Sequence, residues 1–190
     1  MKRRLILVTA ISVLLLASVC SFAQAKDVKP YVLKGVTIMS KMDTKNEIAK
    51  KNMETIVEFF SLYLKDKEKF YSLWVEDEPA VITPFVAEDV AVLKKAVQSG
   101  WGAVKGFWDP IFEWKGTFDW QIDEFIVGEN PNTIVTLSHS VIDVKAGKAF
   151  GNKDVKYNGT YVQIFKFVDG KVKSFEEYYD TALLKSKLGL

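Results

Sequence analysis

The chain contains very little cysteine, histidine and arginine. Its 190 residues include one cysteine (Cys20), one histidine (His139) and two arginines (Arg3 and Arg4). A single cysteine excludes a disulfide framework and a thiolate metal cluster, and a single imidazole excludes a histidine-rich metal site. The sequence also lacks a glycine-rich phosphate loop and a dinucleotide-binding fingerprint. We therefore expect no metal and no cofactor, and stability must come from the apolar core.

The first 25 residues have the three parts of a secretory signal peptide. Met1-Lys-Arg-Arg4 is basic, residues 5–19 are almost wholly apolar, and Phe22-Ala-Gln-Ala25 has the A-x-A cleavage pattern. The apolar run is shorter than the roughly 20 residues that span a bilayer. We predict cleavage after Ala25 and export to a bacterial periplasm or the medium, with no membrane span after processing. Lipidation at Cys20 is the weaker alternative, because valine precedes it where a lipoprotein signal has a small residue.

Processing changes the charge of the protein. The full chain carries 26 basic and 24 acidic residues, a net charge of +2. Removal of Lys2, Arg3 and Arg4 leaves 23 basic residues against 24 acidic ones, a net charge of −1 with no arginine. No arginine is then available for a bidentate phosphate or guanine contact, and a near-neutral chain lacks the electrostatic footprint of a nucleic-acid binder. We expect no nucleic-acid partner.

The rest of the chain has the pattern of one α+β domain, with helices first and strands after. We assign residues 26–43 to a loosely attached leader and 44–190 to a single domain. Helical spacing and a Thr44-Lys-Asn-Glu47 capping box predict a helix from Thr44 to about Leu64. Further helices are predicted over 66–74, capped by Asp66, over 89–98, and over 101–111, interrupted near Asp109-Pro110. Strands are predicted over 80–83, 118–127, 133–144 and 157–180.

The last of these segments is a strong hairpin signal. Two runs rich in β-branched and aromatic residues flank Asp169-Gly170. Alternation places one set of side chains on a common face of each strand: Tyr161, Gln163, Phe165 and Phe167 in the first, and Phe175, Glu177 and Tyr179 in the second. A glutamine and a glutamate among aromatic residues are typical of the lining of a pocket.

A series of motifs follows one another along the chain: Leu73-Trp74, Glu76-Asp77-Glu78, Thr83-Pro84-Phe85, Gly100-x-x-Ala-Val-x-x-Phe-Trp108 and Ile164-Phe-Lys-Phe-x-Asp-Gly-Lys-Val-x-x-x-x-Glu-Tyr-Tyr-Asp180. Their order resembles the nuclear transport factor 2-like superfamily, in particular its SnoaL-like (polyketide-cyclase-like) and ketosteroid-isomerase-like members. The resemblance covers about residues 44–182. It implies a curved antiparallel sheet wrapped around N-terminal helices, with a conical apolar pocket, and often a homodimer.

The same resemblance argues against the best-known chemistry of these folds. Ketosteroid isomerases use an aspartate base, with a tyrosine and a protonated aspartate that hold the oxyanion. The matching positions in this chain are Thr83, Phe59 and Gln163, none of which can take those roles. Epoxide-hydrolase members use an Asp-Arg-Asp arrangement, and the processed chain has no arginine.

Two candidates for proton transfer remain, Glu177 and His139. An inward Glu177 would have a raised pKa, and an inward His139 would be the one imidazole available. The alternatives are a Glu177 at the rim paired with a lysine, and a His139 on the outer face of the sheet. The predicted ligand-binding residues, for several of which core packing is the alternative, are Phe59, Tyr63, Thr83, Trp108, Tyr161, Gln163, Phe165, Phe175, Glu177 and Tyr179.

Three functions stay open at this level. The first is an exported protein whose apolar pocket binds a small hydrophobic molecule. The second is an enzyme of cyclase, isomerase or dehydratase type that transfers a proton in the pocket. The third is a non-catalytic interaction module that forms a homodimer.

Export can be tested by the mass of the processed protein. Protein recovered from the periplasm of a bacterial host should begin at Lys26, and Cys20→Ser should be processed in the same way because that residue is removed. A chain that begins at a lipid-modified Cys20, with processing lost in Cys20→Ser, would show the lipoprotein alternative instead.

Overall fold

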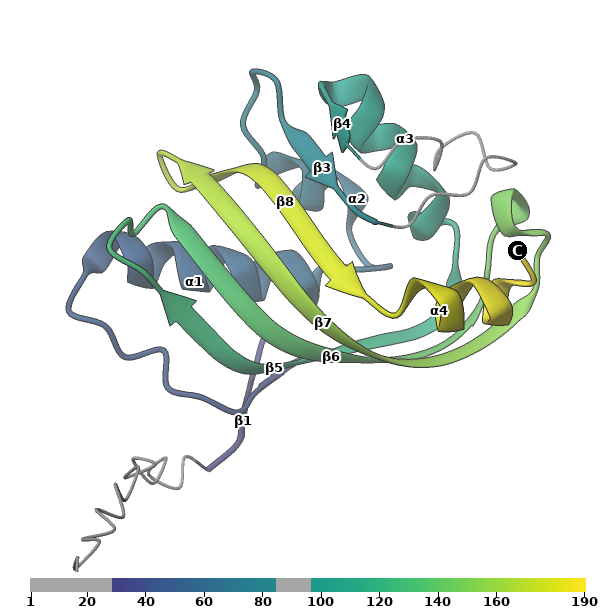
Figure 1. The fold of residues 1–190 in the computed structure, drawn as a ribbon, viewed down its shortest axis with the longest axis horizontal. Helices are drawn as coiled ribbons and strands as arrows, with labels where there is room; N and C mark the ends of the chain where they lie inside the picture. Colours follow the sequence, from purple (N-terminus) through teal and green to yellow (C-terminus); the bar gives the residue numbers. More distant parts are fainter. Residues whose placement is uncertain (1–28, 85–96) are drawn as a thin grey trace, which may run out of the picture.

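The computed structural model describes residues 29–84 and 97–190 (Figure 1). In these residues the chain forms a sheet of eight strands and four helices. The helices are α1 (Glu47–Ser61), α2 (Lys67–Ser72), α3 (Trp101–Phe112) and α4 (Thr181–Leu188). The strands are β1 (Tyr31–Leu33), β2 (Val36–Ile38), β3 (Ala80–Ile82), β4 (Val97–Ser99), β5 (Lys115–Val127), β6 (Thr133–Lys145), β7 (Asp154–Val168) and β8 (Lys171–Tyr179).

The sheet has the order β1-β2-β5-β6-β7-β8-β3-β4. The long strands β5 to β8 are antiparallel neighbours and bend strongly, and α1 lies along the face that they curve around (Figure 1). β2 pairs with β5 and β3 pairs with β8 in parallel. The α+β class is therefore confirmed, but the sheet is mixed and not wholly antiparallel, because the short strands near its edges are reached by longer connections.

The first helix begins later than its predicted capping box. Asn46 is the N-cap, and its side-chain oxygen accepts hydrogen bonds from the backbone N–H groups of Ile48 and Ala49 at 3.0 and 3.1 Å. Thr44 instead accepts a bond from the backbone N–H of Asn46. Asparagine caps helices at least as well as threonine, so the competing residue nearer the helix is used.

Other helix predictions were right in place and wrong in extent. Asp66 caps α2 through the backbone N–H of Lys69, as predicted. α3 continues through Pro110, where an interruption was expected. Most of the helix predicted over 89–98 lies outside the described residues, and its C-terminal end is wrong because Gln98 belongs to β4. α4 was not predicted, because its apolar positions show little helical periodicity.

The described part of the expected leader is joined to the sheet. We expected residues 26–43 to be loosely attached, yet β1 and β2 lie within that segment and β2 pairs with β5. Val36 and Ile38 are buried in the core. Their inward side chains explain why this segment is held.

The β7–β8 hairpin is confirmed. Asp169 and Gly170 have φ angles of 50° and 76°, the positive pair that a two-residue turn of type I′ requires. The register pairs Gln163 with Glu177 and Phe165 with Phe175, so the two predicted faces form one continuous inner surface.

That inner surface packs on α1 around Phe59. The Phe59 ring lies 4.6 to 5.9 Å, between centroids, from a shell of seven other rings, which are Phe60, Tyr63, Phe70, Trp74, Trp108, Phe165 and Phe175. Burying each large apolar side chain stabilises the fold by roughly 1.5–3 kcal/mol. This cluster therefore holds the helices against the sheet.

A substitution at Gly159 on β7 tests how closely the side chains on the inner face of the sheet are packed. A Cβ added there would lie 2.3 Å from the Tyr157 ring and 2.6 Å from the Tyr161 hydroxyl oxygen. We expect Gly159→Ala to lower the free energy of unfolding by roughly 1–3 kcal/mol, because both rings must move. Chemical denaturation measures the change.

The matched control is Gly106→Ala in α3, where an added Cβ meets nothing within 4 Å. It should raise stability by roughly 0.4–1 kcal/mol, through helix propensity and reduced freedom of the unfolded chain. Equal effects of the two substitutions would contradict the close packing at Gly159.

Candidate functional site

A small cavity of about 60 Å³ lies on the inner side of the sheet, between the sheet, α3 and α4. The described part of its wall is almost entirely aromatic and aliphatic and contains one carboxyl group, that of Glu177. The lining residues are Tyr63, Phe107, Trp108, Ile111, Trp114, Phe118, Trp120, Ile142, Tyr161, Glu177, Tyr179 and Leu184. Neither lysine nor histidine is among them.

The local fold positions each part of this wall. Trp108 and Ile111 are three residues apart on α3 and therefore share a face. Phe118 and Trp120 alternate on β5, so both point inward. Leu184 comes from α4, whose first turn is fixed by a hydrogen bond from the Leu183 N–H to the Asp180 side chain at 2.9 Å.

Glu177 is the chemically distinctive residue of the cavity. Its side chain is buried, and that burial raises its pKa to about 8. None of the ion pairs in the described part of the chain includes it. Glu177 therefore faces inward without a lysine partner, and its carboxyl group is mostly protonated at pH 7.

Three tyrosines surround the carboxyl group. Burial, and then the negative charge of Glu177 when ionised, hold the pKa values of Tyr63, Tyr161 and Tyr179 above the ordinary range. The Tyr161 hydroxyl is 2.9 Å from the Ser140 hydroxyl, and Tyr179 hydrogen-bonds to Thr83. All three phenols are consequently neutral at physiological pH.

A row of buried polar groups crosses the sheet beside Glu177. Gln163, its neighbour in register on β7, accepts hydrogen bonds through Oε1 from the Thr136 and Ser138 hydroxyls at 2.7 and 2.8 Å. Its Nε2 is buried and has no hydrogen-bond partner in the described structure. One end of this amide is thus anchored and the other is an unused donor.

The aromatic wall also contains unused donors. The indole N–H groups of Trp108, Trp114 and Trp120 are buried, and none of them has a hydrogen-bond partner within residues 29–84 and 97–190. Folded proteins satisfy nearly all buried polar groups, so several unmet donors at one cavity need an explanation. A bound molecule or water that carries acceptor atoms is the simplest one.

The ten predicted ligand-binding residues separate into two sets. Five of them line the cavity: Tyr63, Trp108, Tyr161, Glu177 and Tyr179. Phe59, Phe165 and Phe175 pack against one another in the core, and Thr83 and Gln163 are buried beside Glu177 without lining the cavity. A role in ligand binding stays a prediction for all ten.

His139 does not belong to this site. Its side chain is 49% exposed and pairs with Asp123 on the outer face of the sheet. Ser138 and Ser140, its neighbours on β6, are the residues that point inward. The inward alternative for His139 is wrong, because strand alternation sends it to the opposite face.

Several lining residues were not predicted. Phe118 and Trp120 carried a detectable signal, since they alternate in a segment correctly assigned to a strand. Trp114 and Leu184 carried none, because one follows α3 in a turn and the other belongs to the unpredicted α4. Only the packing of distant segments brings them to the cavity.

Two further properties concern the described residues. They contain no cluster of three or more histidine, cysteine, aspartate or glutamate residues with the geometry to hold a metal ion. Among the helices of these residues, none combines the length and apolar character of a membrane span.

No protein-family model matches this sequence, and no curated protein matches it either. Solved structures do match the fold. A protein described as a SnoaL-like polyketide cyclase from Jannaschia sp. is 12% identical over 77% of this chain and 96% of its own, with a TM-score of 0.61. A phenazine biosynthesis-related protein from Pseudomonas aeruginosa is 19% identical over 77% and 86%, with a TM-score of 0.58.

A third structure is described by the name of its fold. It is a nuclear transport factor 2-like protein of unknown function from Burkholderia pseudomallei, 19% identical over 74% of this chain and 98% of its own, with a TM-score of 0.56. This chain has the nuclear transport factor 2-like fold. The resemblance seen in the sequence is therefore confirmed at the level of the fold, whose sites differ in chemistry from member to member.

The raised pKa of Glu177 makes stability depend on pH. In the unfolded chain the carboxyl group has its ordinary pKa of 4.5, whereas in the folded chain it holds its proton up to about pH 8. The contribution of this carboxyl group to the free energy of unfolding is fully present below pH 4.5 and is lost as the pH rises to about 8. Above about pH 8 the free energy of unfolding no longer changes through this group. The loss amounts to ~1.4 kcal/mol for each unit of the pKa shift.

Denaturation curves between pH 4 and 9 test this, with Glu177→Gln as the comparison. Relative to that variant, the unmodified protein should lose stability across the interval. Glu176→Gln, on the outer face of the same strand, should keep the dependence. Parallel curves for the unmodified protein and Glu177→Gln would contradict burial of the carboxyl group.

Proposed function

We propose that the cavity binds a small, largely apolar molecule that carries a carbonyl oxygen, and that Glu177 donates a hydrogen bond to that oxygen. The observation that carries the proposal is the buried Glu177 carboxyl group in an otherwise apolar wall. The tryptophans of that wall have unpaired indole N–H donors, and none of the described lining residues is a cation. The protonated Glu177 is the donor with direct access to the cavity.

The chemistry of the wall limits the class of molecule. Rings on several sides favour a flat apolar body. An acidic ligand would bring a negative charge into a site whose described lining residues include no lysine or arginine, at a large desolvation cost. A neutral ketone, quinone or lactone satisfies the donors without that cost.

The size of the cavity sets a second requirement. A volume of about 60 Å³ is well below the ~150 Å³ cavity that accepts one benzene molecule. A ring-sized ligand therefore requires side chains to move. Leu184 is the best placed to do so, because it is partly exposed and comes from the short terminal helix α4.

Proton transfer to or from the bound molecule is the second candidate function. A pKa of about 8 lies close to physiological pH, where a general acid or base works best. The carboxyl group that hydrogen-bonds a carbonyl oxygen can also protonate it, and its carboxylate can remove a neighbouring proton. The fold likeness to a protein described as a polyketide cyclase supports this candidate.

We also propose that the protein acts outside the cytoplasm, because residues 1–25 have the pattern of a signal peptide.

We further propose that the protein forms a homodimer through the outer face of the sheet. That face exposes the apolar side chains of Val141, Val162 and Tyr178, which supports such an interface.

A matched pair of probes tests the carbonyl preference. Acetophenone and ethylbenzene have similar size and shape, but only acetophenone carries an acceptor oxygen. At pH 6 we expect acetophenone to bind about tenfold more tightly, the equivalent of one hydrogen bond, as measured by calorimetry or tryptophan fluorescence. The difference should shrink above pH 8, where Glu177 loses its proton.

Three variants distinguish ligand binding alone from ligand binding with proton transfer. Glu177→Met removes the donor and should abolish the preference, whereas Glu177→Gln keeps a donor and should retain it. Loss of turnover in both variants, with binding kept in Glu177→Gln, would mark proton transfer. Leu184→Ala should strengthen binding of both probes, and a failure of either probe to bind that variant would overturn the proposed cavity function.

A further inference from the structure

The cavity beside Glu177 is bordered on one side by the short helix α4. Leu184 is the one residue of this helix that lines the cavity, and Leu188 is buried one turn further along. The two leucines are four residues apart and therefore share the inward face of the helix. Figure 1 shows α4 running from the end of β8 toward the connection between β6 and β7.

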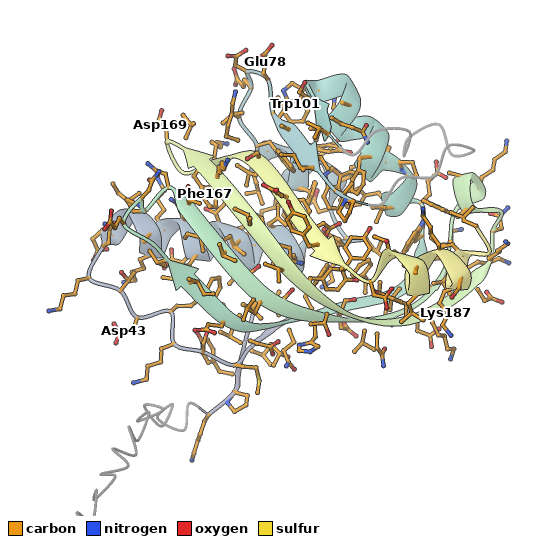
Figure 2. The ribbon with its side chains drawn as sticks, in the orientation of Figure 1. Asp43, Glu78, Trp101, Phe167, Asp169 and Lys187 are labelled. Atoms are coloured by element: carbon orange, nitrogen blue, oxygen red, sulfur yellow. The ribbon has the colours of Figure 1, made fainter. Side chains whose placement is uncertain are left out.

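Little of α4 is packed against the rest of the protein. Leu188 is its one buried residue, and Leu183 is 41% exposed. Figure 2 shows Lys187 of the same helix at the surface. A helix of eight residues is marginal by itself in water. The position of α4 therefore depends on its two inward leucines and on the contacts at its two ends.

The first end of α4 is joined to the sheet without a linker. Strand β8 ends one residue before Asp180, which is not helical and caps α4. The Asp180 carboxylate accepts a hydrogen bond from the Leu183 N–H at 2.9 Å, and its backbone oxygen accepts one from the Leu184 N–H at 3.2 Å. Asp180 is therefore the point about which the helix can turn while the strand stays in place.

The far end of α4 is held by Lys153, from the connection between β6 and β7. Its ammonium group donates to the backbone oxygens of Leu188 and Gly189, at 2.8 and 3.4 Å. The end of a helix leaves such carbonyls without intrahelical partners and favours a positive charge. The Lys153 backbone oxygen in turn accepts a hydrogen bond from the N–H of the buried Ala146 at 2.8 Å. Lys153 thus connects an anchored segment beside the sheet to the end of the helix.

The cavity is too small for a ring-sized molecule while α4 is in this position. Its volume is about 60 Å³, against the ~150 Å³ that holds one benzene molecule. An outward movement of α4 withdraws Leu184 from the wall and breaks the Lys153 hydrogen bonds. Lys153 is not among the residues that line the cavity, so it acts on binding only through the position of α4.

We propose that α4 is an autoinhibitory lid, hinged at Asp180 and latched by Lys153, which occupies space that the ligand needs and moves outward before a ring-sized molecule binds. This lid presupposes the function proposed for the Glu177 cavity and controls access to it. When the closed form predominates, the apparent affinity is reduced by the fraction of molecules that are open. Weakening the latch raises that fraction, and with it the affinity, without a change at Glu177.

Lys153→Met tests the latch, because it removes the ammonium group from a side chain that does not contact the cavity. We expect this variant to bind acetophenone and ethylbenzene about fivefold more tightly, the equivalent of the net energy of one hydrogen bond. The gain should lie in the association rate, measured by stopped-flow tryptophan fluorescence. It should be equal for both probes, so the ratio of their affinities, which reports the carbonyl preference, should not change.

Lys156→Met is the matched control. Lys156 is exposed on the outer face of β7, where it pairs with Asp143, and its removal should leave the binding of both probes unchanged. Gly189→Ala breaks the latch from the side of the helix, because an added Cβ would lie 2.2 Å from the Lys153 ammonium nitrogen. It should change binding in the same direction as Lys153→Met.

Amide hydrogen exchange without a ligand tests the lid separately from the function of the cavity. In Lys153→Met the amides of α4 should exchange about fivefold faster, because exchange follows the local opening equilibrium, and those of β7 and β8 should not change. Unchanged exchange in α4, or unchanged affinity for probes that do bind, would overturn the lid. If neither probe binds any variant, the cavity function fails, and exchange in α4 still decides whether Lys153 holds the helix closed.

Discussion

The position of the helices over the sheet depends on the packing of α1 against the inner face of the β7–β8 hairpin. Phe59 lies with ring centroids 5.2 Å from those of Phe165 and Phe175, which oppose each other across the two strands. This contact fixes the helix over the sheet and sets which strand residues face inward. A shift of one residue in either strand would turn the aromatic set toward solvent, so the register is strongly specified.

The electrostatics of the cavity follow from the same packing. Glu177 is two residues beyond Phe175 on β8 and must point in the same direction. Placed among tryptophan and tyrosine rings, its carboxyl group loses water and gains no cation, and its pKa rises to about 8. The neighbouring Gln163 is held by two hydroxyl groups of β6, so the polar row is ordered even without a ligand.

The structural features that depend only on neighbouring residues were predicted correctly from the sequence. The Asp169-Gly170 turn, the Asp66 cap and the alternation in β7 and β8 each need only a few neighbouring residues, and all three are present. The predictions that failed involve competition or distant partners. Asn46 displaced Thr44 as a cap, and Val36 and Ile38 became core residues because β5 offered them a place to pair.

The sequence by itself determined the α+β class, the Asp169-Gly170 turn and the inward direction of Gln163 and Glu177, because strand alternation and turn chemistry are encoded within short segments. The register that pairs Gln163 with Glu177 also depends on a shift between Lys166 and Phe167, which was not predicted. Only the tertiary structure decided the walls of the cavity and the pairing of the outward His139 with Asp123. The cavity joins residues from α3, α4 and the four long strands β5 to β8, and the ion pair joins β6 to β5. Their geometry depends on how the sheet bends and how the helices pack on it, which no single segment specifies.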